Sequence, residues 1–207
     1  MGPIPHTPII PSDEDIQVDG DTFTTKTSRR STILFDPLIR TGVVRFEVQN
    51  VNYLADVGIA DETVRYERDD VPYARGFDKI VSFCCWGKIH HIGNWIGGLA
   101  EFKNRKIGPR HKTQNPGNWV ALEVNMDSNP RTLSFFVNCV KQPIYVTNIP
   151  PAVRFWAYLN DRDDVFRVIK FEAIPEPTAV NVKGSHSYLQ WGKTIRKNNC
   201  STSNVMK

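Results

Sequence analysis

The sequence predicts an all-β protein, a two-layer antiparallel β-sandwich with extended N- and C-terminal segments. Many short apolar runs alternate with a period of two and are separated by Gly, Pro, Asn and Asp. One of them belongs to an unusually clear β-hairpin. No window of 11 or more residues shows the i, i+3, i+4, i+7 spacing of an amphipathic helix. Together these observations favour strands throughout.

The clearest element is a β-hairpin over residues 120–142. Apolar residues at every second position from Val120 to Met126 predict a strand with one face in the core. Residues 127–130, Asp-Ser-Asn-Pro, are all turn formers, and the chain must reverse there. Residues 132–138 predict the returning strand, and Phe136 on its second face predicts burial on both sides.

The N-terminal half contains the other predicted strands that precede this hairpin. The four prolines at positions 3, 5, 8 and 11 indicate an extended segment over residues 1–14. The predicted strands are 16–18, 21–26, 31–35 (ended by Asp36-Pro37), 42–48, 56–60 and 77–86, the last turning at Gly87-Lys88 into 89–92. Residues 61–76 are polar and are expected to form a long, exposed connection.

After residue 98 the pattern weakens, and residues 98–119 are expected to form a long loop. Residues 143–146 and Pro150-Pro151 are expected to lead into a strand at 153–159. A polar loop at 160–164 and a last strand at 165–171 follow. Beyond Pro177 the chain is expected to pack once, through Tyr188, Leu189 and Trp191. The predicted division is a lead-in (1–14), a sandwich (15–177) and a basic, partly disordered C-terminal segment (178–207).

An ordered set of motifs resembles SPRY domains, which have a concanavalin-like jelly-roll sandwich. The motifs are RFEV at 45–48, GIA at 58–60, VSFCCW at 81–86, the hairpin from EVNMD at 123–127 to FFVN at 135–138, and IPPAVRFWAYL at 149–159. The resemblance covers residues 31–175, and its IPPAVRF and WGK elements are similar to SPRY modules of unicellular eukaryotes. The chain departs from the family pattern at Asn138-Cys139, where Asn-Gly is usual. It also has Gly117-Asn118 where Gly-Asp is common, and about a dozen extra residues precede this position.

The resemblance implies a non-catalytic module that binds a peptide or protein partner through surface loops, without a cofactor. Two alternatives stay open. One is a concanavalin-like carbohydrate-binding protein or hydrolase, and the other is a structural subunit of a larger assembly.

Exposed Tyr and Arg side chains supply the contact area and planar hydrogen bonding that are enriched at interfaces. Two polar loops of this chain carry them, and Trp156 is added because alternation places it opposite Phe155. The candidate partner-binding residues are Arg65, Tyr66, Tyr73, Arg75, Trp156, Asn160, Asp161 and Arg162.

Composition is that of an ordinary globular domain, with a net charge of +4 and 23% charged residues. The first 21 residues contain five acids and no Lys or Arg, giving −5, so the remainder carries +9. No run approaches the roughly 20 apolar residues of a membrane helix, and the N-terminus lacks the order of a signal peptide. Four cysteines in a poor disulfide framework suggest free thiols. We expect a cytoplasmic or nuclear monomer that is not secreted.

Metal binding is not expected, although Cys84, Cys85, His90 and His91 are zinc-type ligands. Strand alternation sends the members of each adjacent pair to opposite faces, so at most one of each can converge. The basic residues between Lys103 and Lys112, near Trp95 and Trp119, raise nucleic-acid binding as a minor alternative to a solvated loop.

Catalytic residues are not expected either. Cys139 has no acid and base visibly arranged around it. Glu123 and Asp127 lie four residues apart on one strand, about 13 Å, which exceeds both two-carboxylate geometries of glycoside hydrolysis. An outward polar face is the favoured interpretation of this pair.

Overall fold

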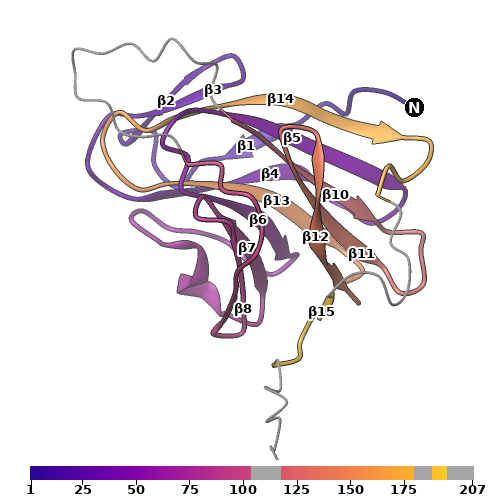
Figure 1. The fold of residues 1–207 in the computed structure, drawn as a ribbon. Coiled ribbons are helices and arrows are strands. Elements are labelled where there is room, and N and C mark those ends of the chain that lie inside the picture. Colours follow the sequence, from indigo (N-terminus) through magenta and orange to yellow (C-terminus); the bar gives the residue numbers. More distant parts are fainter. Residues whose placement is uncertain (104–117, 180–187, 195–207) are drawn as a thin grey trace, which may run out of the picture.

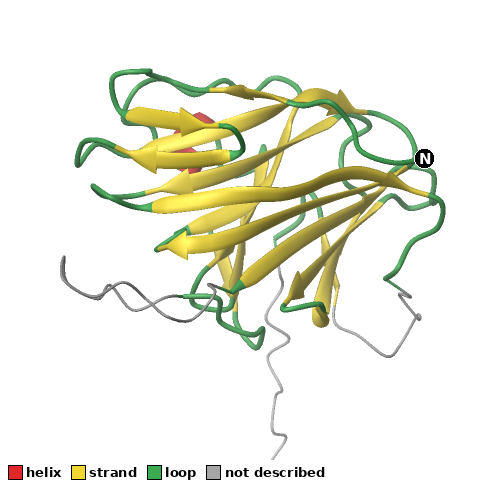
Figure 2. Cartoon of the chain, turned by 90° about the horizontal axis from the view of Figure 1, so that it is seen from above, coloured by secondary structure: helices red, strands yellow, loops and turns green. Residues whose placement is uncertain are grey.

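The computed structural model describes residues 1–103, 118–179 and 188–194, and these form two stacked β-sheets (Figure 1). The all-β sandwich predicted from the sequence is confirmed. Neighbouring strands are antiparallel, except that β12 and β15 are parallel. Seen from above, the strands of the two sheets run across each other in two layers (Figure 2). Among the described residues no helix is both long and apolar enough to cross a bilayer.

The seven-stranded sheet has the order β1-β4-β13-β6-β7-β8-β9. Its strands are β1 (Thr7–Ile9), β4 (Ser31–Ile39), β13 (Val153–Leu159), β6 (Asp56–Asp61), β7 (Ile80–Cys84), β8 (Lys88–His91) and β9 (Asn94–Ile96).

The eight-stranded sheet has the order β15-β12-β11-β10-β5-β14-β3-β2. Its strands are β15 (Tyr188–Gln190), β12 (Val140–Thr147), β11 (Thr132–Val137), β10 (Trp119–Asn125), β5 (Val43–Asn52), β14 (Val165–Ile174), β3 (Thr22–Thr25) and β2 (Ile16–Asp19).

The central hairpin forms as predicted, and its strands pair with Val124 opposite Leu133 and Leu122 opposite Phe135. The predicted two-sided burial of the returning strand is also confirmed. Phe135 faces the core between the sheets, whereas Phe136 packs on the outer face with Ala121 and Ala179. The alternation of apolar side chains was enough to predict which face each of these residues occupies, because successive residues of a strand point to opposite faces.

Stacked phenylalanine rings fill the space between the sheets. Phe46 of β5 stacks on Phe155 of β13, with ring centroids 5.1 Å apart, and both side chains are fully buried. Phe23 stacks on Phe166 at 4.8 Å. Offset aromatic pairs of this kind add to the stabilisation from burial of apolar area. The two sheets are therefore joined by a dense apolar layer.

Three details differ from the sequence-based predictions. Strand β4 does not end at Asp36-Pro37 but runs on to Ile39, because a bulge against Val153 and Phe155 of β13 accommodates the proline. Strands β1, β9 and β15, each three residues long, and the longer β12 were not predicted as strands. The connection after β6 is not exposed throughout, since it contains a short 3₁₀ helix, η1 (Pro72–Arg75), and buried side chains.

The hairpin turn that departs from the family pattern adopts the conformation that usually favours glycine. Asn138 and Cys139 have φ angles of 49° and 65°. A non-glycine residue there is sterically less favourable. Asn138 is held in place because its side-chain oxygen accepts a hydrogen bond from the Trp119 amide at 3.0 Å.

Candidate functional site

The connection between β6 and β7 crosses the outer face of the seven-stranded sheet. Its Val64 and Tyr66 side chains pack on Leu34, Trp156 and Tyr158, which form a second apolar cluster outside the main core. The Tyr66 hydroxyl donates a hydrogen bond to the Pro72 carbonyl at 2.7 Å. Burial raises the pKa of the Tyr66 phenol. This connection is therefore a fixed layer over the sheet.

Ion pairs hold the same connection at its edges. Arg68 donates to the buried Asp15 carboxylate at 2.7 Å, and this contact lowers the pKa of Asp15. Asp69 pairs with Arg30 at 3.2 Å. Arg75 pairs with Asp70 at 2.6 Å, leaving its guanidinium partly exposed.

At the end of this connection, exposed aromatic rings gather over strands β7 to β9. We call Tyr73, Phe77, His90 and Trp95 the aromatic surface. Tyr73 stacks on Phe77 at 4.9 Å, Phe77 meets the His90 ring edge-to-face at 5.2 Å, and His90 stacks on Trp95 at 4.2 Å. Tyr73, Phe77 and Trp95 are 44%, 43% and 55% exposed.

His90 is the buried support of this surface. Its side chain is only 5% exposed, and burial lowers the pKa of the imidazole. The ring is therefore neutral at pH 7. Large, contacting aromatic rings on a rigid neutral base form a suitable surface for a protein contact.

An acidic group lies beside the aromatic surface. Ser82 is the cross-strand partner of His90, and its hydroxyl donates to the Asp56 carboxylate at 3.0 Å. Burial raises the pKa of Asp56 to about 6. In the described part of the chain no Lys, Arg or His forms an ion pair with Asp56. Above pH 6 this group is a negative charge without a basic partner.

The predicted loop residues between β13 and β14 are ordered by Asp164. The backbone amides of Asn160 and Asp161 donate to its carboxylate at 3.1 and 2.9 Å. Arg162 donates to the Lys26 carbonyl at 3.0 Å. Asn160 also accepts a hydrogen bond from Tyr158 at 2.9 Å.

Tyr158 and the segment between β3 and β4 link the two predicted loops. Tyr158 packs in the apolar cluster with Tyr66, and Arg30 of this segment pairs with Asp69. The part of the β6–β7 connection around Asp69 and the β13–β14 loop therefore lie near the same end of strands β4 and β13. Arg65, Tyr73, Asn160 and Arg162 are exposed, and Arg75 and Asp161 are partly exposed.

Two of the predicted contact residues are buried, contrary to the expected exposure. Tyr66 is 9% exposed, and Trp156 is fully buried. The Trp156 indole lies over Gly58, where an added Cβ would be 2.4 Å from its Cζ2 atom. Alternation correctly placed Trp156 on the face opposite Phe155, but the β6–β7 connection covers that face. A surface partner cannot reach either ring directly.

Sequence analysis did not place Phe77, His90 and Trp95 among the partner-binding residues; it considered His90 only as a zinc-type ligand and Trp95 only beside the basic loop. Phe77 was assigned to a strand, and Trp95 lies on a strand too short to show alternation. His90 pairs with Trp95 across the turn at Ile92-Gly93. This turn was the available signal in the sequence, but it indicates the pairing only once β9 is known.

The zinc-type residues are separated as alternation predicts. His90 belongs to the aromatic surface, whereas His91 accepts a hydrogen bond from the Gly192 amide at 2.9 Å and contacts the Ile80 carbonyl at 2.6 Å. Cys84 and Cys85 are free and buried, and burial raises the pKa of the Cys85 thiol to about 12. Within the described ranges no three His, Cys, Asp or Glu residues converge on a possible metal site.

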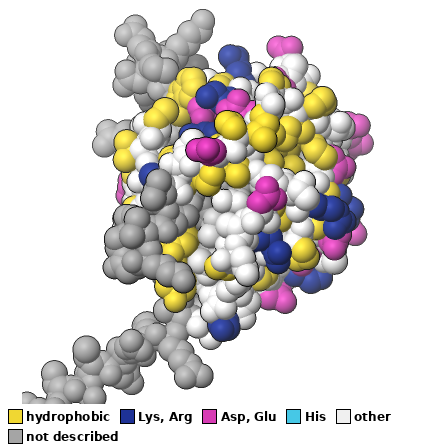
Figure 3. All heavy atoms as spheres, turned by 90° about the vertical axis from the view of Figure 1, so that its right-hand side faces the viewer, with side chains coloured by type: hydrophobic (Ala, Val, Ile, Leu, Met, Phe, Trp, Pro, Cys, Tyr) yellow, Lys and Arg dark blue, Asp and Glu magenta, His cyan; other side chains and the backbone are white. Residues whose placement is uncertain are grey.

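The basic segment between Lys103 and Lys112 lies almost wholly outside the described residues. Lys103 is described, and its ammonium pairs with Glu101 at 2.6 Å and lies 4.2 Å from the Trp86 ring centroid. On the face shown in Figure 3, acidic and basic side chains of the described residues are interspersed. That face lacks the continuous positive charge typical of a nucleic-acid interface.

The predicted carboxylate pair has structural contacts instead of an open site. Glu123 is 2% exposed, because the chain after β14 covers it. Its carboxylate accepts hydrogen bonds from the Thr178 hydroxyl and from the Ala179 amide, the latter at 3.0 Å. Asp127 accepts from the Gly42 amide at 2.8 Å. The expectation that Glu123 faces water is therefore wrong.

Comparison with known proteins assigns the fold to the SPRY-like, concanavalin-like β-sandwiches. The SPRY domain of human HERC1 matches with a TM-score of 0.55 and 14% identity, covering 77% of this chain and 96% of that one. The TRIM65 PSpry domain matches with a TM-score of 0.54 and 7% identity, covering 74% and 83%.

A carbohydrate recognition domain also shares the architecture. The metal-free Emp46p domain matches with a TM-score of 0.52 and 6% identity, covering 80% of this chain and 86% of that one. No family model matches the sequence. No curated protein matches it either. At these identities the likeness establishes the two-sheet β-sandwich fold alone.

Proposed function

We propose that the chain is a non-catalytic protein-recognition module and that its aromatic surface is the main contact for a segment of a partner protein. The observation that carries this proposal is the exposure of Tyr73, Phe77 and Trp95 in one contacting group. Aromatic rings with few rotatable bonds give large contact area at low entropic cost and dominate many interfaces. The SPRY domains of HERC1 and TRIM65 support the assignment at the level of fold.

Charge beside the aromatic surface specifies the partner further. The Asp56 carboxyl is ionised above pH 6, and the neutral His90 ring does not oppose a cation. A basic side chain of the partner is attracted both by Asp56 and by the exposed faces of the aromatic rings. Arg75, which is partly exposed and two residues from Tyr73, and the exposed Arg162 of the β13–β14 loop are the further polar contacts of this proposal.

A non-catalytic role is consistent with the roles of the candidate reactive groups. Glu123 holds the chain after β14, Asp127 caps a loop amide, and the thiols of Cys84 and Cys85 are buried. Free buried thiols also fit the proposed cytoplasmic or nuclear location.

The test uses two tryptophans of nearly equal exposure in the same β7–β9 unit. Trp95 is 55% exposed and belongs to the aromatic surface, whereas Trp86 is 52% exposed and contacts Lys103. A partner is first identified by proximity labelling, and its affinity for the purified chain is then measured by calorimetry. Trp95→Ala is expected to weaken binding by about tenfold or more, which corresponds to about 1.4 kcal/mol.

Trp86→Ala is the matched control and is expected to leave the affinity within about twofold. Equal losses in both variants would remove the proposal, as would unchanged binding in Trp95→Ala. Circular dichroism of each variant separates lost contact from lost folding.

A further inference from the structure

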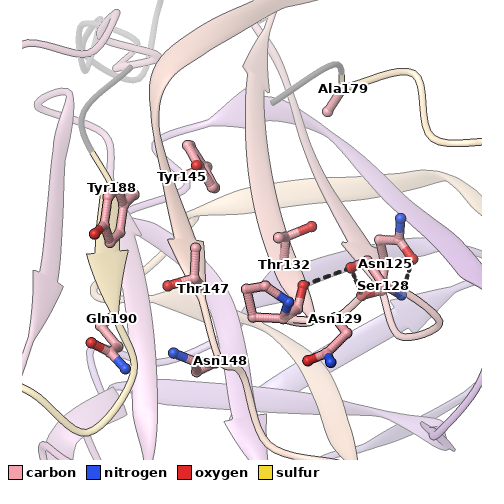
Figure 4. A pocket seen from close by; sticks show the side chains of 11 residues that line it. Asn125, Ser128, Asn129, Thr132, Tyr145, Thr147, Asn148, Ala179, Tyr188 and Gln190 are labelled. Atoms are coloured by element: carbon pink, nitrogen blue, oxygen red, sulfur yellow. Dashed lines mark hydrogen bonds between the residues drawn. The ribbon is translucent and has the colours of Figure 1, made fainter. Parts of the chain in front are cut away.

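A pocket lies on the outer face of the eight-stranded sheet. It has a volume of about 680 Å³, within the range of roughly 300–1,000 Å³ typical of ligand sites. Side chains from β12, β15 and the β10–β11 turn converge on it (Figure 4). The main core separates it from the aromatic surface, so it is a distinct site.

The lining of this pocket contains no Asp, Glu, Lys or Arg among the described residues. Amides and hydroxyls provide its polar groups instead. They belong to Asn125, Ser128, Asn129, Thr132, Thr147 and Asn148, with Gln190 on the far side. In a chain with 23% charged residues, such a lining favours a neutral ligand, because a buried ionic group would lack a counter-charge.

Several of these polar groups are held in place and remain available. Ser128 donates to the Asn125 carbonyl at 3.2 Å and to the Pro130 carbonyl at 2.8 Å, which fixes the turn beside the pocket. Thr132 lies on a central strand, and its hydroxyl has no hydrogen-bond partner among the described residues. The same holds for the side-chain amide of Gln190 on β15. A ligand can therefore pair with Thr132 and Gln190 without first breaking a hydrogen bond within the described part of the chain.

Two tyrosines form the apolar wall of the pocket. Tyr145 of β12 and Tyr188 of β15 are paired residues of the parallel strands, with ring centroids 6.0 Å apart. Tyr145 is 6% exposed, whereas Tyr188 is 62% exposed and can be covered by a ligand. In Figure 4 both rings stand beside the amides and hydroxyls.

We propose that this pocket binds a neutral oligosaccharide. A pyranose ring has an apolar face of C–H groups and a periphery of hydroxyls that both donate and accept hydrogen bonds. The Tyr188 ring covers the apolar face, while the hydroxyls pair with the amide and hydroxyl groups of the opposite wall. Because the described lining residues carry no charge, sulfated, phosphorylated or sialylated sugars are disfavoured.

The experiment presents immobilised neutral and anionic oligosaccharides to the full chain and then measures the best neutral ligand by calorimetry. Tyr188→Ala is expected to weaken binding by at least about tenfold, because it removes the stacking surface. Tyr145→Phe keeps the ring and removes only the hydroxyl, and a loss of about threefold to tenfold is expected. Trp95→Ala, on the opposite sheet, is the control and should leave sugar binding unchanged.

Each other outcome overturns the proposal. The contradicting results are that no neutral oligosaccharide binds at about 10 mM, that anionic sugars bind in preference, or that Tyr188→Ala binds as tightly as the original chain. Binding of a neutral peptide instead of a sugar at Tyr188 would also contradict it. Because a different residue controls the protein contact, failure here leaves the protein-recognition proposal intact.

Discussion

The partly buried Asp56 carboxyl beside the aromatic surface makes stability depend on pH in an unusual direction. Burial raises the pKa of Asp56 from its ordinary 3.8 to about 6. The folded chain therefore holds this proton more tightly than the unfolded chain does. Between about pH 4 and pH 6 the unfolded state releases the proton first, so this group makes the fold less stable as the pH rises.

The size of the effect follows from the two pKa values. Each tenfold difference in proton affinity is about 1.4 kcal/mol, so a rise from 3.8 to about 6 costs about 3 kcal/mol once Asp56 is ionised in both states. Asp56→Asn cannot ionise, and its side-chain oxygen can still accept the Ser82 hydrogen bond. The variant should match the original chain near pH 4 and exceed its free energy of unfolding by about 3 kcal/mol near pH 7.5.

Urea unfolding followed by tryptophan fluorescence at pH 4.5, 5.5, 6.5 and 7.5 measures this difference. With a denaturant slope of about 2 kcal/mol/M, the midpoint of the variant should rise by about 1.5 M relative to the original chain at the highest pH. Asp78→Asn, an exposed aspartate, is the control and should show no such divergence. Parallel pH curves for the original chain and Asp56→Asn would refute the reasoning.

Three further predictions concern packing, the chain after β14 and the thiols. Gly58→Ala should lose about 3 kcal/mol of unfolding free energy in the urea assay, because the new Cβ would lie 2.0 Å from a backbone oxygen. Gly97→Ala, whose new Cβ would have its nearest atom at 3.9 Å, is the control and should change the unfolding free energy little. Glu123→Ala should cost about 2 kcal/mol and speed amide hydrogen exchange after β14, measured by mass spectrometry, since buried donors lose their acceptor. Iodoacetamide should label the exposed Cys139 well before Cys85, whose buried thiol has a pKa of about 12, as peptide mapping would show.

The sheet structure could be predicted because its physical cause is local. From Val120 to Val137 each inward residue is apolar and each turn residue favours reversal, so register and burial follow from alternation. The strand at residues 31–39 shows the limit of this reasoning. Pro37 predicts the end of a strand, but a bulge in the pairing with β13 accommodates it. The local sequence does not show how strands that are distant in the chain pair.

The candidate site was only partly predictable. Tyr73 and Arg75 were identified from the loop composition, and both lie at the surface. Tyr66 follows the same composition but folds inward, because its ring covers Trp156 and its hydroxyl finds the Pro72 carbonyl. Which aromatic side chain of a polar loop turns inward depends on the sheet beneath the loop. The loop sequence alone does not contain that information.

The two proposed sites are expected to act independently, and the core gives the reason. Phe46 and Phe155 stack between the sheets with no exposed surface, and close-packed interiors do not deform continuously. Coupling between two sites needs an element with two arrangements that both ligands bias. Saturating the pocket with a neutral oligosaccharide should therefore leave the affinity for a protein partner unchanged. One molecule can then hold a glycan on one sheet and a polypeptide on the other, and a sandwich with two separate outer faces permits both contacts at once.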